Sequence, residues 1–315
     1  MESRHLGRTG LRISSVGLGC NNFGWTIDEA ASQAVVDRAL DLGVTVFDTA
    51  ASYGKSFGAS EELLGRMLRD RRKNITLITK FGLTPSGAGT RRDSSRAAIM
   101  QGVEASLRRL RTDWIDVYML HWPDPETPIG ETLGVLDDLV HAGKVRYVAC
   151  SNLEPWKLAD SVWISRHEGL ERFVAAENHY NVLVRDCEKD LLPTLAHYGL
   201  GLLPYFPLAS GMLTGKYSRL GGKPAGRLTD NFLRLGDTFM TERNFEIVED
   251  LEAFAKERGR TLLGLAISWL LANPLVSSVI CGATKPEQVE QNIMASGWAM
   301  TSEDLARIDQ ITGLR

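Results

Sequence analysis

The sequence has few of the features that mark disulfide-rich or metal-binding proteins. Four cysteines occur in 315 residues, and Cys20, Cys150, Cys187 and Cys281 lie far apart without a Cys-x-x-Cys pair. This spacing argues against a disulfide scaffold or a zinc ribbon and predicts a reducing compartment. The six histidines are dispersed and no His-Glu-x-x-His motif occurs, so we expect no metal centre.

Excess charge and long apolar runs are also lacking. Lys and Arg number 36 against 39 Asp and Glu, a formal net charge of −3, which gives no basis for binding nucleic acid or an anionic membrane. The first ten residues have no signal-peptide core, and the longest apolar stretch, residues 262–272, is too short to cross a bilayer. We expect a cytoplasmic monomer or homo-oligomer with no nucleic-acid or membrane partner.

The chain alternates short β-type runs with helical patterns from one end to the other. Asp28 is placed to cap the first helix and Gly43 to end it. We expect strands at residues 15–19, 44–47, 75–79, 115–120, 145–149, 173–176, 201–204 and 276–280. We expect helices at residues 28–41, 60–69, 95–110, 129–141, 155–167, 187–197, 241–258, 261–272 and 286–295.

Eight strand–helix units without a visible linker predict one domain over residues 1–315. Strands that are apolar on both faces indicate a parallel sheet, and eight of them predict an α/β fold of the (β/α)8 TIM-barrel type with extra C-terminal helices. Residues on either side of Gly10 predict a β-hairpin ahead of the barrel. A polar, Gly-rich insertion at residues 218–238 is long enough to have a function.

Four titratable residues follow adjacent strands of this barrel: Asp48, Tyr53, Lys80 and His121. Each alone has an ordinary explanation as a cap, a packed ring or a solvated charge. Together they fit proton donation to an oxygen at the C-terminal rim, where barrel enzymes carry their chemistry. Lys80, held by Asp48, would lower the pKa of Tyr53, and His121 would orient a substrate carbonyl.

At these residues the sequence closely resembles the aldo-keto reductase superfamily. The segments that carry the resemblance span the chain: LGRTGLRISSVGLG, FDTAASYG, LITKFG, YMLHWPD, KVRYVACSN, PLASGMLTGKY and GATKPEQVEQN. The resemblance implies an (α/β)8 barrel that reduces aldehydes and ketones with NADPH and without a metal, and that can also oxidise alcohols. It implies that Tyr53 is the general acid, that Lys80 and Asp48 tune it, and that His121 orients the carbonyl.

The same resemblance implies the cofactor site. Ser151 and Asn152 would hold the nicotinamide carboxamide, Tyr205 would stack on its ring, and Lys285 at a helix N-terminus would favour the 2′-phosphate of NADPH over NAD. The insertion would fold over the cofactor. The remaining predicted contacts are Cys20, Asn21, Glu177, Phe206, Pro207, Leu208, Ser210, Gly211, Lys216, Arg227, Gly282, Thr284, Gln288, Gln291 and Asn292.

Three positions depart from the pattern of many relatives. Glu177 replaces a Gln beside the carboxamide, Phe206 replaces a Ser, and Thr284 replaces an Arg. An ionised Glu177 would stabilise the positively charged oxidised ring over the neutral reduced one. We therefore hypothesise that Glu177 shifts the bound cofactor towards its oxidised form unless it is protonated or salt-bridged.

The substrate pocket is expected to have aromatic walls. The candidates are Phe23, Trp25, Phe81 and Trp122, beside Tyr53. Polar residues 90–93, Asn22 and Asn178 would bind hydroxyls or an anionic group, which favours a sugar-derived or small oxo substrate.

Two other functions are compatible with the barrel. A class I aldolase would use Lys80 as a Schiff-base nucleophile, although Asp48 nearby should raise the lysine pKa rather than lower it. A regulatory barrel resembling potassium-channel β-subunits would bind nucleotide with little turnover.

Overall fold

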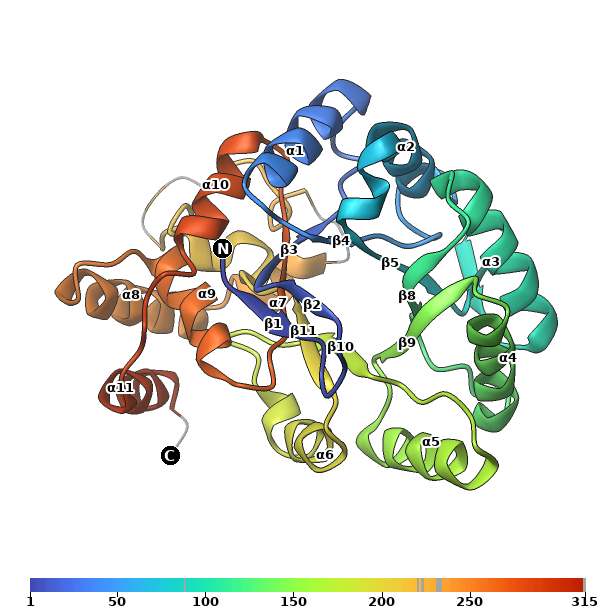
Figure 1. Ribbon diagram of the computed structural model, residues 1–315. Helices are drawn as coiled ribbons and strands as arrows, with labels where there is room; N and C mark the ends of the chain where they lie inside the picture. Colours follow the sequence, from blue (N-terminus) through green and yellow to red (C-terminus); the bar gives the residue numbers. More distant parts are fainter. Residues whose placement is uncertain (88, 220, 222–223, 231–233, 314–315) are drawn as a thin grey trace.

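The computed structural model describes residues 1–87, 89–219, 221, 224–230 and 234–313, and its centre is a ring of parallel strands (Figure 1). In chain order the strands of the ring are β3 (Val16–Gly19), β4 (Val46–Asp48), β5 (Thr76–Phe81), β8 (Ile115–Leu120), β9 (Val145–Ser151), β10 (Ala175–His179), β11 (Gly201–Tyr205) and β12 (Val279–Gly282). Their spatial order is β11-β10-β9-β8-β5-β4-β3-β12, and every paired neighbour is parallel.

The ring closes between β11 and the segment that leads into β12. The amide of Leu202 donates to the carbonyl of Leu275 across 2.7 Å, and the amide of Ser277 donates to the carbonyl of Leu202 across 2.9 Å. These two bonds form a single parallel bridge between Leu202 and Val276 in place of a continuous ladder. The nearly closed barrel confirms the predicted (β/α)8 fold.

Helices surround the ring on the outside (Figure 1). The Asp28 side chain accepts a hydrogen bond from the amide of Ala31, and Gly43, with φ of 79°, follows the end of the first helix, as predicted. The helices are α1 (Glu29–Asp41), α2 (Ala59–Leu68), α3 (Arg96–Leu110), α4 (Ile129–His141), α5 (Pro155–Glu168), α6 (Leu191–Tyr198), α7 (Leu235–Phe239), α8 (Glu242–Glu257), α9 (Leu262–Ala272), α10 (Pro286–Met294) and α11 (Ser302–Thr312).

The predicted N-terminal hairpin closes the end of the barrel where the strands begin. Its strands are β1 (Ser3–His5) and β2 (Arg12–Ser14). Leu6 and Ile13 are buried among the barrel's interior side chains, and the amide of Ser14 donates to the Thr45 hydroxyl just before β4. Because this end is plugged, the opposite end is the one left for ligands.

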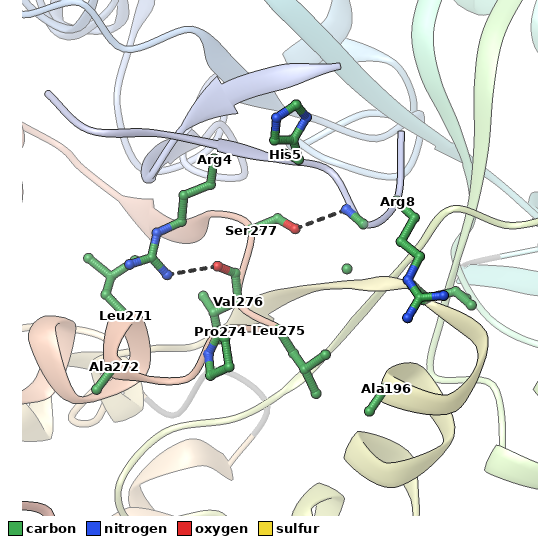
Figure 2. A pocket seen from close by; sticks show the side chains of 14 residues that line it. Arg4, His5, Arg8, Ala196, Leu271, Ala272, Pro274, Leu275, Val276 and Ser277 are labelled. Atoms are coloured by element: carbon green, nitrogen blue, oxygen red, sulfur yellow. Dashed lines mark hydrogen bonds between the residues drawn. The ribbon is translucent and has the colours of Figure 1, made fainter. Parts of the chain in front are cut away.

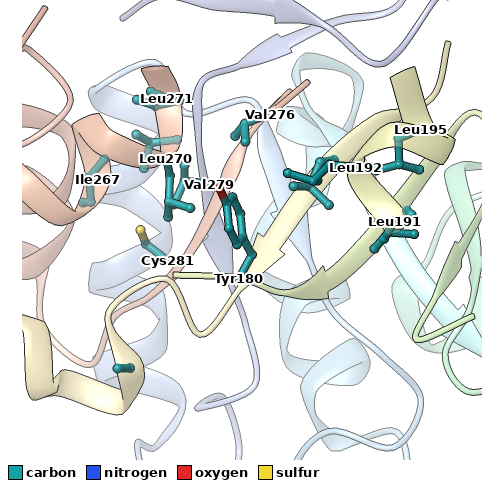
Figure 3. Close-up of a cluster of buried hydrophobic side chains, with 14 of the residues drawn as sticks. Tyr180, Leu191, Leu192, Leu195, Ile267, Leu270, Leu271, Val276, Val279 and Cys281 are labelled. Carbon is teal, nitrogen blue, oxygen red and sulfur yellow. The ribbon is translucent and has the colours of Figure 1, made fainter. Parts of the chain in front are cut away.

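The core lies between the barrel and its helices. Figure 3 shows one part of it, in which Tyr180 lies near apolar residues of β12, α6 and α9. The ring of Tyr180 packs 5.1 Å from that of Trp269. Side chains buried in this way each contribute about 1.5–3 kcal/mol relative to an exposed position. Among the described residues, no helix combines the length and apolar character needed to cross a membrane.

The expected starts are wrong at three strands and one helix, and one hairpin is missing from the prediction. The second and sixth strands begin two residues later than expected, at Val46 and Ala175, and the eighth three residues later, at Val279. In each strand the apolar run marks burial, which starts before the strand ladder does. The helix expected from residue 187 begins at Leu191. Strands β6 (Leu83–Ser86) and β7 (Gly89–Arg92) form a hairpin with an exposed second strand, which has no apolar periodicity to reveal it.

The insertion at residues 218–238 is partly described. Helix α7 occupies its end, and Arg227 to Asp230 are placed, whereas residues 220, 222–223 and 231–233 lie outside the described part. The C-terminal helix α11 begins with a capping box made by Thr301 and Asp304. It is one of the expected extra C-terminal helices, although no residue range was predicted for it.

Candidate active site

The four predicted catalytic residues come together at the open end of the barrel. The Lys80 ammonium donates hydrogen bonds to a carboxylate oxygen of Asp48, to the carbonyl of Thr49 at 3.2 Å and to the phenolic oxygen of Tyr53 at 3.3 Å. The ring of His121 lies edge-on to that of Tyr53, with centroids 5.7 Å apart. A phenol and an imidazole therefore flank one small region above the strands.

The local fold explains this convergence. Asp48 ends β4, Lys80 lies near the end of β5, and His121 follows β8, so parallel pairing brings their side chains to one rim. Tyr53 lies in the turn between β4 and α2. This turn requires Gly54, whose φ is 108° and whose added Cβ would lie 2.6 Å from the Cβ of Ala59.

Burial and the charge of Lys80 act on the pKa of Tyr53 in opposite directions. Burial raises it above its ordinary value, and the positive charge of Lys80 offsets this only in part. Lys80 lowers the pKa of Tyr53 as expected, but desolvation of the phenolate outweighs one nearby ammonium, so the net shift is upward. Burial alone would lower the pKa of Lys80, but the carboxylates of Asp48 and Glu177 raise it overall, so Lys80 stays charged.

His121 is uncharged at ordinary pH. Burial, and then the charge of Lys80, lower its pKa to about 3. Its Nδ1 lies 3.4 Å from the hydroxyl of Ser52, and its backbone carbonyl accepts a hydrogen bond from the Asn152 amide at 3.1 Å. A neutral imidazole can donate one hydrogen bond to a carbonyl oxygen without carrying charge into the site.

A second carboxyl group joins the site, and the catalytic motifs alone do not reveal it. Glu177, 3% exposed on β10, places Oε2 at 3.4 Å from the Lys80 ammonium. Burial and the charge of Asp48 raise its pKa to about 8, partly offset by Lys80. The sequence predicts Glu177 as a cofactor contact but contains no signal for its ion pair, which depends on β10 facing β5 across the barrel.

The predicted carboxamide contacts form one hydrogen-bonded group. The Ser151 hydroxyl donates to the carbonyl of Glu177 at 2.7 Å, and the Asn152 amide donates to the Ser151 oxygen at 2.9 Å. The Tyr205 hydroxyl donates to the Asn152 side-chain oxygen at 2.9 Å. His179, which the sequence does not suggest, stacks on Tyr205 with ring centroids 5.4 Å apart and nearly parallel planes.

The segment after β11 turns sharply. Phe206, Ala209 and Ser210 have φ of 50°, 46° and 56°, a left-handed conformation that is rare outside glycine and concentrates at functional sites. Pro207 and Leu208 lie within this turn, and Gly211 follows it with φ of 104°.

The insertion reaches back over the same rim. The Arg227 guanidinium donates to the side-chain oxygen of Asn22 at 2.9 Å and lies 6.0 Å from the centre of the Phe206 ring. An added Cβ at Gly282 would lie 3.5 Å from the Asn22 amide and 3.8 Å from the Asn21 oxygen. Predicted cofactor contacts from four distant segments thus lie around Asn22, which the sequence predicts for substrate binding.

The segment that leads into α10 completes this set. Lys285 is exposed directly before the helix, and the Gln288 side chain accepts a hydrogen bond from the amide of Thr284 at 2.7 Å. Gln291 is exposed and Asn292 is buried on the same helix, and Lys216 is exposed near Gly211. A helix N-terminus beside a lysine is suited to bind phosphate.

The chemistry of these residues fits a nicotinamide nucleotide. The Ser210 hydroxyl and Oε2 of Glu177, both predicted cofactor contacts, are buried without a hydrogen-bond partner in the described part of the chain. Buried polar atoms of this kind need a partner. Cys20, also predicted as a contact, is fully buried beside Asp48, and burial is the main cause that raises its pKa.

The four predicted aromatic walls differ in position. Phe23 is fully buried in the cluster between α1 and α2, and Phe81 packs on Tyr118 at 4.7 Å, so both contribute to the core. Trp25 is partly exposed and Trp122 is 36% exposed, so these two have surface available to a ligand. Asn178 has a buried side-chain oxygen with no hydrogen-bond partner in the described residues.

A separate surface cavity of about 600 Å³ lies at the opposite end of the barrel (Figure 2). Arg4, His5 and Arg8 of the N-terminal hairpin border it, and Arg4 donates to the carbonyl of Val276 at 3.0 Å. None of the predicted site residues lines this cavity. In the described part of the chain, no cluster of three or more His, Cys, Asp or Glu residues is arranged to hold a metal ion.

Comparison with known proteins agrees with this geometry: residues 15–312 match the aldo/keto reductase family, and the chain belongs to that family. It is 34% identical to the L-glyceraldehyde 3-phosphate reductase of Escherichia coli K12, over 98% of this chain and 92% of the relative. It is also 34% identical to the aldo-keto reductase YhdN of Bacillus subtilis, over 99% and 93% of the two chains.

A third relative, 36% identical over 98% of this chain and 92% of its own, is a Schizosaccharomyces pombe protein named provisionally as a voltage-gated potassium channel subunit beta. The family and its oxidoreductase members make this chain an NAD(P)-dependent oxidoreductase that acts on carbonyl compounds.

Proposed function

We propose that this protein uses NADPH to reduce a sugar-derived or similarly small aldehyde or ketone, with Tyr53 as the general acid. The observation that carries the proposal is the hydrogen bond from Lys80 to the Tyr53 oxygen, next to the His121 ring. The bound nicotinamide supplies the hydride, and the protein residues handle the proton.

Tyr53 donates its proton to the carbonyl oxygen as that oxygen becomes an alkoxide. Because its pKa is raised, the phenol is protonated at neutral pH and carries the proton that the reaction requires. The tyrosinate left behind is stabilised by the Lys80 ammonium 3.3 Å away, which Asp48 holds in place. Lys80 therefore stabilises the product of proton transfer, and in doing so it holds the pKa of Tyr53 below the value that burial alone would give.

His121 orients the substrate. Since its pKa is near 3, it acts as a neutral hydrogen-bond donor and does not compete with Tyr53 as an acid. The Asn152 side chain donates a hydrogen bond to the backbone carbonyl of His121 and accepts one from the hydroxyl of Tyr205. Through Asn152, the group that would hold the nicotinamide is linked to the group that would hold the substrate.

The proposed cofactor contacts extend from the carboxamide to the adenosine phosphate. Ser151, Asn152 and Glu177 would bind the carboxamide, and Tyr205 would cover the ring. Arg227 would lie over the pyrophosphate. Lys285 before α10 supports NADPH over NAD, since a 2′-phosphate gains both a cation and a helix N-terminus there.

The proposed substrate carries hydroxyl or anionic groups. The Arg92 guanidinium of β7 lies 5.3 Å from the centre of the Trp122 ring and donates to the carbonyl of Pro123, so it is held at the rim beside an exposed aromatic face. An arginine so placed suits a phosphate or carboxylate. The reductase of L-glyceraldehyde 3-phosphate among the relatives supports a small phosphorylated aldehyde.

The two alternative functions, an aldolase and a regulatory barrel, differ from a reductase in the pKa required of Lys80 and in the turnover expected. A Schiff-base lysine needs a lowered pKa, whereas the carboxylates around Lys80 raise its pKa. This opposes the aldolase function. A regulatory barrel that binds nucleotide with little turnover is supported by the relative named for a potassium channel subunit, and measured turnover separates it from an enzyme.

The test is steady-state oxidation of NADPH, and in parallel of NADH, with a panel of small aldehydes and ketones that includes glyceraldehyde and its 3-phosphate. We expect turnover with NADPH and a lower KM for the phosphorylated aldehyde. Stoichiometric nucleotide binding without turnover on any member of the panel would support the regulatory barrel instead.

A further inference from the structure

The catalytic lysine lies between two carboxyl groups rather than one. Asp48 accepts a hydrogen bond from the Lys80 ammonium, and Oε2 of Glu177 lies 3.4 Å from the same nitrogen. The side chains of all three residues are at most 3% exposed. One buried ammonium can balance the charge of only one buried carboxylate.

The geometry decides which carboxyl group is ionised. Asp48 receives a hydrogen bond from Lys80, whereas Oε2 of Glu177 has ion-pair distance but no hydrogen-bond partner in the described residues. A buried carboxylate oxygen that accepts no hydrogen bond disfavours the ionised form relative to the neutral acid. The shared proton of the pair therefore resides on Glu177, and the raised pKa of Glu177, about 8, agrees with this assignment.

The charged and titratable groups around Glu177 come from every neighbouring element. Ser151 and Asn152 of β9 and its following turn contribute polar groups but no charge. The ionisable groups that interact with Glu177, or with its partners Asp48 and Lys80, are Asp48 of β4, Lys80 of β5, Tyr53 of the turn after β4, His121 after β8, Tyr205 of β11 and Cys20 after β3. Lys80 is the sole cation among these six, because His121 is neutral at ordinary pH.

We propose that Glu177 is a positioning residue whose protonation state controls the active site. When Glu177 is protonated, the positive charge of Lys80 stabilises the Tyr53 tyrosinate. When Glu177 is ionised, its negative charge offsets that of Lys80 and the tyrosinate is less stable. This inference rests on the proposed function, because it concerns how Tyr53 donates its proton. When Glu177 ionises, its negative charge raises the pKa of Tyr53 further. The phenol then becomes a weaker acid, and carbonyl reduction slows.

The same ionisation acts on the cofactor. A carboxylate beside the predicted carboxamide contacts attracts the positive oxidised ring and has no such effect on the neutral reduced ring. Raising the pH through the titration of Glu177 therefore slows reduction and strengthens binding of NADP relative to NADPH. Both changes work against reduction in alkaline conditions.

The experiment compares wild type, Glu177→Gln and Glu177→Asp from roughly pH 6 to pH 10. Infrared difference spectra of the cofactor-free proteins follow the carbonyl band of a protonated carboxyl group. In parallel, equilibrium titrations give the ratio of the Kd values for NADP and NADPH, and kinetics give the shape of the kcat profile. Infrared spectra report on Glu177 whether or not the protein reduces carbonyls.

We expect the wild type to lose a carboxyl band near pH 8, with a fall in kcat of roughly tenfold, which corresponds to a change of about one unit in the pKa of the proton donor. In Glu177→Gln the band, the fall in kcat and the pH dependence of the Kd ratio should all be absent. Glu177→Asp should restore a titration at a shifted pH. Identical pH profiles in wild type and Glu177→Gln, or the absence of a carboxyl band that depends on Glu177, would overturn the inference. Failure of the proposed function would be seen separately, as absence of turnover in the wild type.

Discussion

The Lys80 ammonium donates a hydrogen bond to the phenolic oxygen of Tyr53 across 3.3 Å, while it also binds Asp48. The ammonium therefore lies next to the oxygen that becomes negatively charged when Tyr53 loses its proton, and it stabilises the tyrosinate. Replacing Lys80 with Met should lower kcat for carbonyl reduction by about 100- to 10,000-fold, the usual contribution of a general acid and its partner.

Lys80→Met should also destabilise the fold, because it leaves Asp48 buried without its cation, at a cost of about 3–5 kcal/mol. Activity and urea unfolding can be measured on the same preparations. The matched control is Lys73→Met at an exposed position. Equal losses in both variants would contradict the role given to Lys80.

Arg227 connects the insertion to the rim through Asn22. Arg227→Gln should raise the Kd of NADPH by roughly tenfold, the value of one charge-assisted contact, and should speed its release. Stopped-flow fluorescence measures the release rate directly. Arg234→Gln, which removes an exposed arginine of the same region, should leave the rate unchanged. Unaltered release from Arg227→Gln would count against a cofactor contact.

Arg92 and Arg91 provide a matched pair on one hairpin. Arg92 lies beside the Trp122 ring, whereas Arg91 binds Asp93 and is mostly exposed. Arg92→Gln should raise the KM for a phosphorylated aldehyde by about tenfold and leave the KM for the neutral aldehyde nearly unchanged. Arg91→Gln should change neither value, because exposed ion pairs contribute little. Equal KM shifts for both aldehydes would rule out anion recognition by Arg92.

The raised pKa of Glu177 predicts how stability depends on pH. The folded protein keeps a proton on Glu177 up to about pH 8, whereas an unfolded glutamate loses it near pH 4. The folded state thus binds more protons between these values, so its free energy of unfolding falls as the pH rises, by up to about 1.4 kcal/mol per pH unit. This sign is opposite to that of a salt-bridged carboxylate with a lowered pKa.

Glu177→Gln should remove that slope, so the variant should gain stability relative to wild type as the pH increases from about 4 to about 8. Urea unfolding at several pH values measures the difference. Glu168→Gln at an exposed position on α5 is the control and should run parallel to wild type. A constant difference between Glu177→Gln and wild type at every pH would show that Glu177 is not protonated in the fold.

Much of this architecture is predictable because the signals are local. Asp28 and Gly43 mark the ends of α1, and apolar runs mark the strands that carry Asp48, Lys80 and His121. The barrel topology then brings these three residues to one rim, so their meeting follows from the sequence once eight strands are recognised.

Other features depend on contacts that no local pattern encodes. The ion pair between Lys80 and Glu177 joins strands that are not neighbours in the ring, and the stacking of His179 on Tyr205 depends on the register of β10 against β11. The pKa of Tyr53 is decided by burial, which the residue types alone do not reveal. The exposed hairpin of β6 and β7 has no apolar face to mark it.

The most direct test of the account is the Tyr53→Phe variant, assayed for NADPH-dependent aldehyde reduction and for NADPH affinity. Removal of one hydroxyl leaves the ring in place and takes away the proton that the mechanism transfers. We predict a Kd for NADPH within about twofold of wild type and a kcat lowered by at least about 100-fold. Reduction at the wild-type rate in Tyr53→Phe would contradict it.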